Sequence, residues 1–163
     1  MKRMDEETRL QLIVEAVKYC QRVKRAGMPS SCYTKALREP IYFLWDCRAG
    51  GTKETRSHYR SPATVGLKIG DGQLVGDHAI PFKYLQSELL ELDDVTPETV
   101  RGVLRKYEVR VWITKAEDRL LSAKKLRSKM PDAWNRTDPL ARYKAAGIQL
   151  IENHSAMAKR RNR

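Results

Sequence analysis

The chain has 163 residues, of which 32 are Lys or Arg and 20 are Asp or Glu, so its formal net charge is +12. This length suits one domain with its own core, and a hydrophobic content of 41% excludes a disordered chain. No apolar run approaches the roughly 18 residues of a membrane span, and no apolar leader follows the charged N-terminus. We therefore expect a cytoplasmic protein with no membrane partner.

The excess of positive charge predicts a polyanionic partner. A basic chain attracts phosphates at long range, which favours nucleic acid over a protein that is merely soluble and basic. The three cysteines (Cys20, Cys32 and Cys47) are widely spaced and form no CxxC pair, so they predict reduced thiols rather than a zinc knuckle.

The first 50 residues predict a helical N-terminal part. Residues 5–25 have apolar side chains at helical spacing, acids at the start and bases at the end, and Gly27 and Pro29 follow them. Ser30 or Ser31 predicts the start of a second helix that runs to about Arg38. Pro40 predicts a break near residue 39 and then a new segment, because proline is tolerated only in a first helical turn.

Residues 52–62 lack apolar periodicity and predict a loop. Four side chains of this loop could contact the phosphates of a nucleic-acid backbone: Lys53, Arg56, His58 and Arg60. A solvated charged loop is the alternative.

The middle of the chain predicts strands and helices in mixed order. Residues 65–69 and 73–80 predict a β-hairpin with a tight Asp71-Gly72 turn. Residues 82–92 and 97–107 predict two helices, and residues 108–113 alternate like a strand.

Thr114 and Glu117 form a capping-box pattern, which predicts a helix over 115–128. A last helix is predicted from Pro139 to about Ile151. The expected fold class is therefore α+β, mostly helical, with a small antiparallel β core. We expect a single domain over 1–163. Its parts are a helical part (1–50), a core (65–128) with a helical insert (82–107), a C-terminal helix (137–152) and a basic tail (155–163).

Asp77, His78 and Asp118 are the candidate catalytic group. Antiparallel pairing of strands 73–80 and 108–113 would bring the start of helix 115–128 close to the Asp77-His78 pair. Two carboxylates suit Mg²⁺, and a histidine that does not bind the metal can deprotonate water. Each residue also has a structural alternative: a turn cap for Asp77, a half-buried histidine for His78 and a helix N-terminal acid for Asp118.

The stretch Val75-Gly76-Asp77-His78-Ala79-Ile80-Pro81 resembles the Asp-His-x-x-Pro signature of HNH endonucleases, the ββα-metal or His-Me finger group. Residues 111–121 resemble the second strand and following helix of that family. The resemblance implies Asp77 and Asp118 as metal ligands and His78 as general base. It implies Mg²⁺ as cofactor, with Mn²⁺, Ni²⁺ or Zn²⁺ as alternatives. No Asn lies between His78 and Asp118 to orient the histidine, so a backbone carbonyl could take that role.

The sequence thus predicts a metal-dependent endonuclease of the HNH type that hydrolyses DNA phosphodiester bonds. An RNase on the same scaffold is one alternative, because no residue pattern distinguishes ribose from deoxyribose. A non-catalytic nucleic-acid-binding protein with a degenerate site is the other, and the missing Asn motivates it. The pattern determines no oligomeric state.

Overall fold

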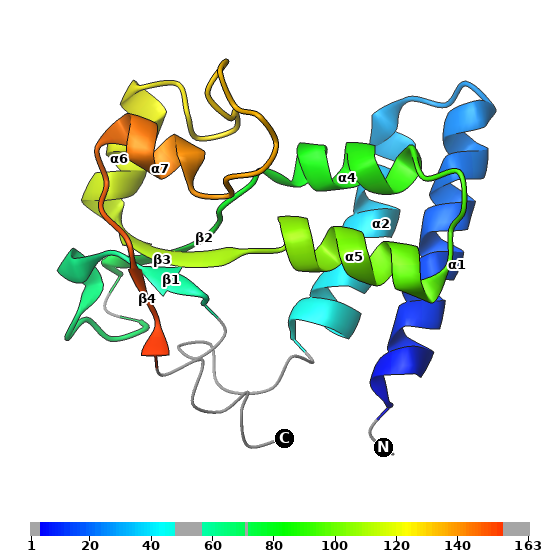
Figure 1. Cartoon of the computed structure of the whole chain (residues 1–163), viewed down its shortest axis with the longest axis horizontal. Helices are drawn as coiled ribbons and strands as arrows, with labels where there is room; N and C mark the ends of the chain where they lie inside the picture. Colours follow the sequence, from blue (N-terminus) through cyan, green and yellow to red (C-terminus); the bar gives the residue numbers. More distant parts are fainter. Residues whose placement is uncertain (1–3, 48–56, 71, 155–163) are drawn as a thin grey trace. The chain divides into compact units, whose positions relative to one another are not determined.

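The computed structural model describes residues 4–47, 57–70 and 72–154, and it divides into two compact units (Figure 1). Unit 1 comprises Met1–Gly50 and Phe82–Lys106, and unit 2 comprises Gly51–Pro81 and Tyr107–Arg163. Helices make up 53% of the described residues and their sheet has four strands, which confirms the α+β class. The helical insert therefore belongs to the same unit as the N-terminal helices.

Unit 1 is helical. Its α-helices are α1 (Glu6–Arg25), α2 (Thr34–Pro40), α4 (Phe82–Leu90) and α5 (Pro97–Tyr107), with a short 3₁₀ turn η1 (Ser30–Cys32) before α2. α1 buries the predicted stripe (Leu10, Ile13, Val14, Val17 and Cys20), and the Asp5 carboxylate caps it by accepting the Thr8 N–H at 2.7 Å. No helix among the described residues has both the length and the apolar character needed to cross a bilayer.

The predicted break before Pro40 is wrong. The helical path continues through Pro40 into a π-helical turn, η2 (Ile41–Asp46), where the Cys47 N–H donates to the Tyr42 carbonyl. Proline removes one hydrogen bond of the α-helical pattern, and a switch to wider spacing lets the chain continue in the same direction. Ile41 and Leu37 are buried on this path, so packing outweighs the local preference.

Unit 2 contains a mixed sheet in the order β2-β3-β1-β4. The strands are β1 (Tyr59–Arg60), β2 (Leu74–His78), β3 (Arg110–Thr114) and β4 (Ile151–Glu152). β2 pairs antiparallel with β3, as predicted, while β1 pairs parallel with β3 and antiparallel with β4.

The predicted hairpin partner of β2, residues 65–69, is not a strand. Residues 62–64 form the 3₁₀ turn η3 (Pro62–Thr64), and Gly66 and Gly70 have positive φ values of 84° and 107°. Those conformations interrupt extended pairing. β3 offers β2 a better partner, because Val75 lies opposite Ile113 on the buried face of the sheet.

Helices α6 (Lys115–Ala123) and α7 (Ala141–Ala146) lie on one side of this sheet (Figure 1). The core between them and the sheet consists of Ala79, Val109, Val111, Ile113, Leu121, Tyr143, Ala146 and Ile148. Both helices are shorter than predicted. Lys125 (φ 59°) and Gly147 (φ 79°) take the left-handed conformation that ends a helix, and β4 follows α7 where helix was expected.

The capping box at the start of α6 is confirmed. The Glu117 N–H donates to Thr114 Oγ1 at 3.2 Å, and Glu117 Oε2 accepts the Thr114 N–H at 2.8 Å. The same oxygen accepts the hydroxyl of Ser61, a fully buried residue just after β1, at 2.7 Å. The cap therefore joins the helix to two strands.

We predict that Thr114→Ala lowers the free energy of unfolding by about 1 kcal/mol, because one N-cap acceptor is lost. Urea unfolding followed by circular dichroism measures this change. Ser122→Ala, on the exposed side of the same helix, is the control and should change stability by less than about 0.5 kcal/mol. Equal effects of the two substitutions would contradict the role of the cap.

Candidate active site

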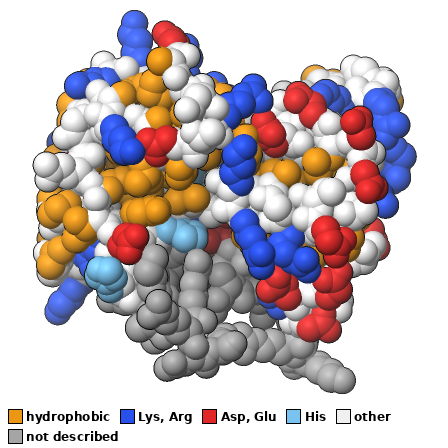
Figure 2. Space-filling model, in the orientation of Figure 1, with side chains coloured by type: hydrophobic (Ala, Val, Ile, Leu, Met, Phe, Trp, Pro, Cys, Tyr) orange, Lys and Arg blue, Asp and Glu red, His pale blue; other side chains and the backbone are white. Residues whose placement is uncertain are grey.

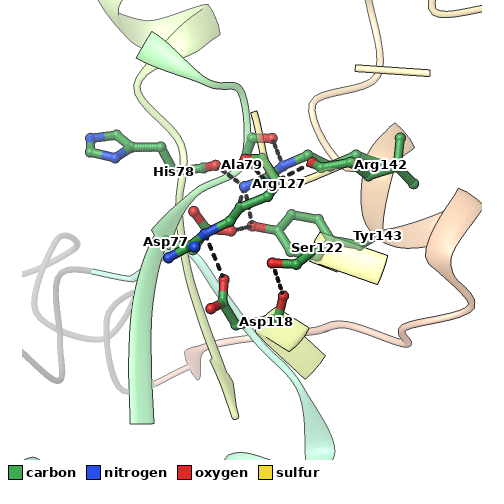
Figure 3. A network of polar contacts seen from close by, with 9 residues as sticks. Asp77, His78, Ala79, Asp118, Ser122, Arg127, Arg142 and Tyr143 are labelled. Carbon is green, nitrogen blue, oxygen red and sulfur yellow. Dashed lines mark hydrogen bonds and ion pairs between the residues drawn. The ribbon is translucent and has the colours of Figure 1, made fainter. Parts of the chain in front are cut away.

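Asp77 and His78 lie on opposite faces of the sheet. Successive side chains of a strand alternate, and cross-strand partners share a face. Asp77 lies opposite the buried Val111, on the face that α6 and α7 cover, whereas His78 lies opposite Arg110 on the other face. Figure 3 shows the His78 ring extending away from the polar network around Asp77.

Arg142 on α7 is the centre of the network around Asp77 (Figure 3). Its side chain is only 1% exposed, yet its nitrogens have several acceptors. Nε donates to the carbonyl of Ala79 at 2.8 Å, and Nη1 donates to the carbonyls of Leu126 and Arg127, both at 3.1 Å. Nη2 donates to Asp77 Oδ2 and to the His78 carbonyl. One buried cation thus joins the exit of β2 to the segment that follows α6.

Tyr143 completes this network on the Asp77 side. Its hydroxyl donates to Asp77 Oδ2 at 2.7 Å. Burial raises the pKa of the Tyr143 phenol, and the charge of Asp77 raises it further, against the opposing effect of Arg142. The phenol therefore stays protonated and remains a donor. Asp77 Oδ2 consequently has two donors, a guanidinium and a phenol.

Asp118 lies in the first turn of α6, which packs beside β2. Its Oδ1 is 3.6 Å from Arg127 Nε, and the Arg127 side chain is 69% exposed. An ion pair so long and exposed contributes less than about 1 kcal/mol. Figure 3 draws Asp118 and Asp77 within one polar network, on the opposite side from the His78 ring.

The fit of these residues to Mg²⁺ is incomplete. Asp77 pairs with Arg142, and Asp118 pairs with Arg127. In each pair the guanidinium compensates the carboxylate charge that a metal ion would otherwise compensate. In the described part of the chain, no three His, Cys, Asp or Glu side chains are placed to bind one ion. As paired here, the two carboxylates do not form a ready cation site, so the metal requirement stays a prediction.

His78 has a strong partner of its own on the other face. Its Nε2 is 3.0 Å from Oε1 of Glu108, whose side chain is only 3% exposed. Arg110 Nε donates to the same oxygen at 3.0 Å. Burial raises the pKa of Glu108, but the hydrogen bond and charge of His78, together with Arg110, outweigh burial and lower that pKa below its ordinary 4.5. Glu108 is therefore a carboxylate that orients the imidazole.

The predicted nucleic-acid contacts are only partly described. Lys53 and Arg56 lie outside the described residues. His58 precedes β1, and its Nδ1 accepts the backbone N–H of Arg110 at 3.0 Å. Arg60 Nε donates to Thr64 Oγ1 at 3.1 Å, and its Nη2 donates to the Thr64 carbonyl at 2.6 Å. Both side chains thus have structural roles in or beside the sheet.

The sequence interpretation missed Glu108 and Arg142. A signal for Glu108 was present, because the alternation of residues 108–113 places it with Arg110 on one face, and antiparallel pairing places His78 opposite Arg110. The carboxylate, rather than an Asn or a backbone carbonyl, orients the histidine. No local pattern marks Arg142, because the acceptors around it come from two segments remote from it in the chain, residues 77–79 and 126–127.

Hydrophobic side chains gather on the face where α7 and β4 lie (Figure 2). A pocket there is lined by Leu140, Tyr143, Lys144, Gly147, Ile148, Gln149, Leu150 and Ile151. Its lining includes neither His78 nor the two candidate carboxylates. The pocket therefore adds no catalytic group to the site.

Comparisons with protein-family models, with curated proteins and with solved structures found no match. The case for a function therefore depends on the residues and geometry described above.

We predict that Arg142→Met lowers the free energy of unfolding by about 3–5 kcal/mol, because it leaves Asp77 and several carbonyls without their buried donor. Arg127→Met is the matched control and should cost less than about 1 kcal/mol, since Arg127 is exposed. Urea unfolding of both variants measures the difference. A small effect of Arg142→Met would show that the network contributes little to the fold.

Glu108 should also give the protein a distinct acid response. Because the pKa of Glu108 is lowered on folding, its contribution to stability is complete above pH 4.5 and is lost as the pH falls through the lowered value. The stability difference between the protein and Glu108→Gln should therefore shrink below pH 4.5. Urea unfolding between pH 3 and pH 7 measures it, with exposed Glu152→Gln as control. A difference that does not vary with pH would contradict the ion pair.

Proposed function

We propose that this chain is a nuclease of the HNH type that hydrolyses phosphodiester bonds of DNA with His78 as general base. The observation that carries this proposal is the contact of 3.0 Å between His78 Nε2 and the buried carboxylate of Glu108. A buried carboxylate that orients an imidazole is the arrangement that prepares a histidine to take a proton. The net charge of +12 supports an anionic polymer as substrate.

In this proposal the two ring nitrogens of His78 have different roles. Glu108 accepts a hydrogen bond from Nε2–H, so the neutral ring has its lone pair on Nδ1. Among the described residues, none supplies a hydrogen-bond partner to Nδ1. Nδ1 is then the atom that accepts a proton from the attacking water. The imidazolium that forms is stabilised by the Glu108 carboxylate 3.0 Å away.

Arg110 places a positive charge beside this base. Its guanidinium shares Oε1 of Glu108 with His78, so the two side chains lie next to each other on one face of the sheet. A guanidinium in this position favours a phosphate group and the negative charge that develops on it during attack. The requirement for Mg²⁺ that the resemblance implies remains part of the proposal and needs measurement.

A non-catalytic nucleic-acid-binding protein is the second candidate. The observation that favours it is the pairing of Asp77 with the buried Arg142, which occupies an oxygen that a metal ligand would need. RNA remains an alternative substrate for either candidate.

We predict that His78→Gln lowers the rate of plasmid nicking by roughly 10²–10⁴-fold, the usual contribution of a general base. The glutamine amide can still donate to Glu108, so the fold should be retained. The measurement is a plasmid digest with Mg²⁺, Mn²⁺, Ni²⁺ or Zn²⁺ and with EDTA, and a parallel digest of RNA. Exposed His154→Gln is the matched control and should cleave like the unchanged protein.

The outcomes separate the candidates. Unchanged cleavage by His78→Gln would remove His78 from the mechanism. Absence of cleavage under every metal condition, with DNA binding intact, would favour the binding protein. Cleavage that persists in EDTA would show that the proposed metal is not required.

A further inference from the structure

The positive charge of the described residues is concentrated in unit 2. In unit 1 the described acidic and basic side chains are equal in number, whereas in unit 2 the basic ones are in excess. One group of basic residues lies along α6 and the segment after it. All its members are exposed, and we call them the α6 basic surface: Lys115, Arg119, Lys124, Lys125, Arg127 and Lys129.

The acids within this stretch do not neutralise the surface. Glu117 is the capping-box residue and accepts from Thr114 and Ser61. Among the described residues, Asp118 pairs with Arg127 alone, at 3.6 Å. Among the described residues, the other members of the surface have no ion-pair partner. Several uncompensated cations along a helix and the segment after it are the electrostatic arrangement that suits a phosphate backbone.

Lys125 gives independent support. Its φ of 59° lies in the left-handed region, at the helix end where glycine is normally preferred. Its N–H donates to the Ser122 carbonyl at 3.0 Å, so the conformation belongs to the helix stop. A lysine there strains the backbone for no packing benefit, because its side chain is exposed. Lys125 thus places an exposed cation at the helix stop, where glycine would adopt the same conformation without strain.

The segment that ends the surface also lies close to the backbone of His78. Arg142 bonds the carbonyls of Leu126 and Arg127 as well as the carbonyl of His78. The segment after α6 and the exit of β2 are therefore separated by the width of one guanidinium group. The imidazole of His78 extends from the opposite face of the sheet, so a chain of phosphates bound at the α6 basic surface would pass the end of the sheet to reach it.

We propose that the α6 basic surface binds the phosphodiester backbone of the nucleic acid and that Lys125 is one of its phosphate contacts. The inference takes its substrate class from the proposed function. It assigns the backbone contact to residues different from the 52–62 loop that the sequence indicated.

The test uses binding alone. The full chain with His78→Gln is titrated with a duplex DNA oligonucleotide at several salt concentrations. Lys115→Gln, Lys124→Gln and Lys129→Gln are combined in one variant, and exposed Lys18→Gln, Lys24→Gln and Lys35→Gln of unit 1 form the matched control with the same net charge. The α6 variant should lose roughly tenfold or more in affinity, and the slope of log K against log salt should fall by about 0.9 for each contact. The control should change neither quantity comparably.

Lys125→Gly separates binding from folding. Glycine relieves the left-handed strain, so the urea midpoint should stay equal or rise, while the salt slope should fall by about one. A lower midpoint with unchanged DNA binding would overturn the role of Lys125.

Equal losses of DNA affinity in the α6 and control variants would contradict a binding role for the α6 basic surface, since net charge alone would then explain binding. The proposal would also be overturned if the α6 variant bound DNA like the unchanged protein but no longer bound vesicles of anionic lipid. The α6 basic surface would then be a membrane-binding surface. If the α6 variant alone loses DNA affinity and the unchanged protein cleaves no nucleic acid, the α6 basic surface is supported as the DNA-binding site. The proposed nuclease activity would then be wrong.

Discussion

The structure of unit 2 depends on one buried cation. Arg142 is almost fully enclosed, and a guanidinium in such a place is tolerated only when its donors are satisfied. Asp77 supplies the opposite charge, and the carbonyls of β2 and of the segment after α6 supply the remaining acceptors. Because the acceptors come from separate elements, the requirements of a single side chain bring the exits of β2 and α6 together.

The pairing with Arg142 gives Asp77 a structural role that differs from the one the resemblance implies. In the resemblance to HNH endonucleases, this acid is a metal ligand next to the general base. Here one of its oxygens accepts from a guanidinium and a phenol, and its neighbour His78 lies on the other face with Glu108. Strand alternation separates the two roles, so the sheet has a structural ion pair on the covered face and an imidazole–carboxylate pair on the other.

In the proposed function, binding and chemistry use opposite faces of the sheet in unit 2. α6 covers the face of Asp77, and its solvent side holds the basic residues. His78 and Arg110 lie on the opposite face, yet Arg142 keeps the backbone of His78 beside the segment after α6. In the proposed function, the nucleic acid would have to pass the end of the sheet to contact both groups.

The antiparallel pairing of β2 with β3, which the sequence offered as a hypothesis, is confirmed by the structure. Local patterns in the sequence determined the α+β class, the helix over residues 6–25 and the capping box at Thr114. These features depend on residues that are close in the chain or on alternation along a strand. The loss of the 65–69 strand, the passage of the helix through Pro40 and the partners of Asp77 and His78 were decided by the tertiary structure. Each depends on which distant groups compete for the same position, and burial of Arg142 and Glu108 exists only after the chain has folded. Short-range propensity contains no information about such partners, because the desolvation that makes these contacts strong arises from packing between remote segments.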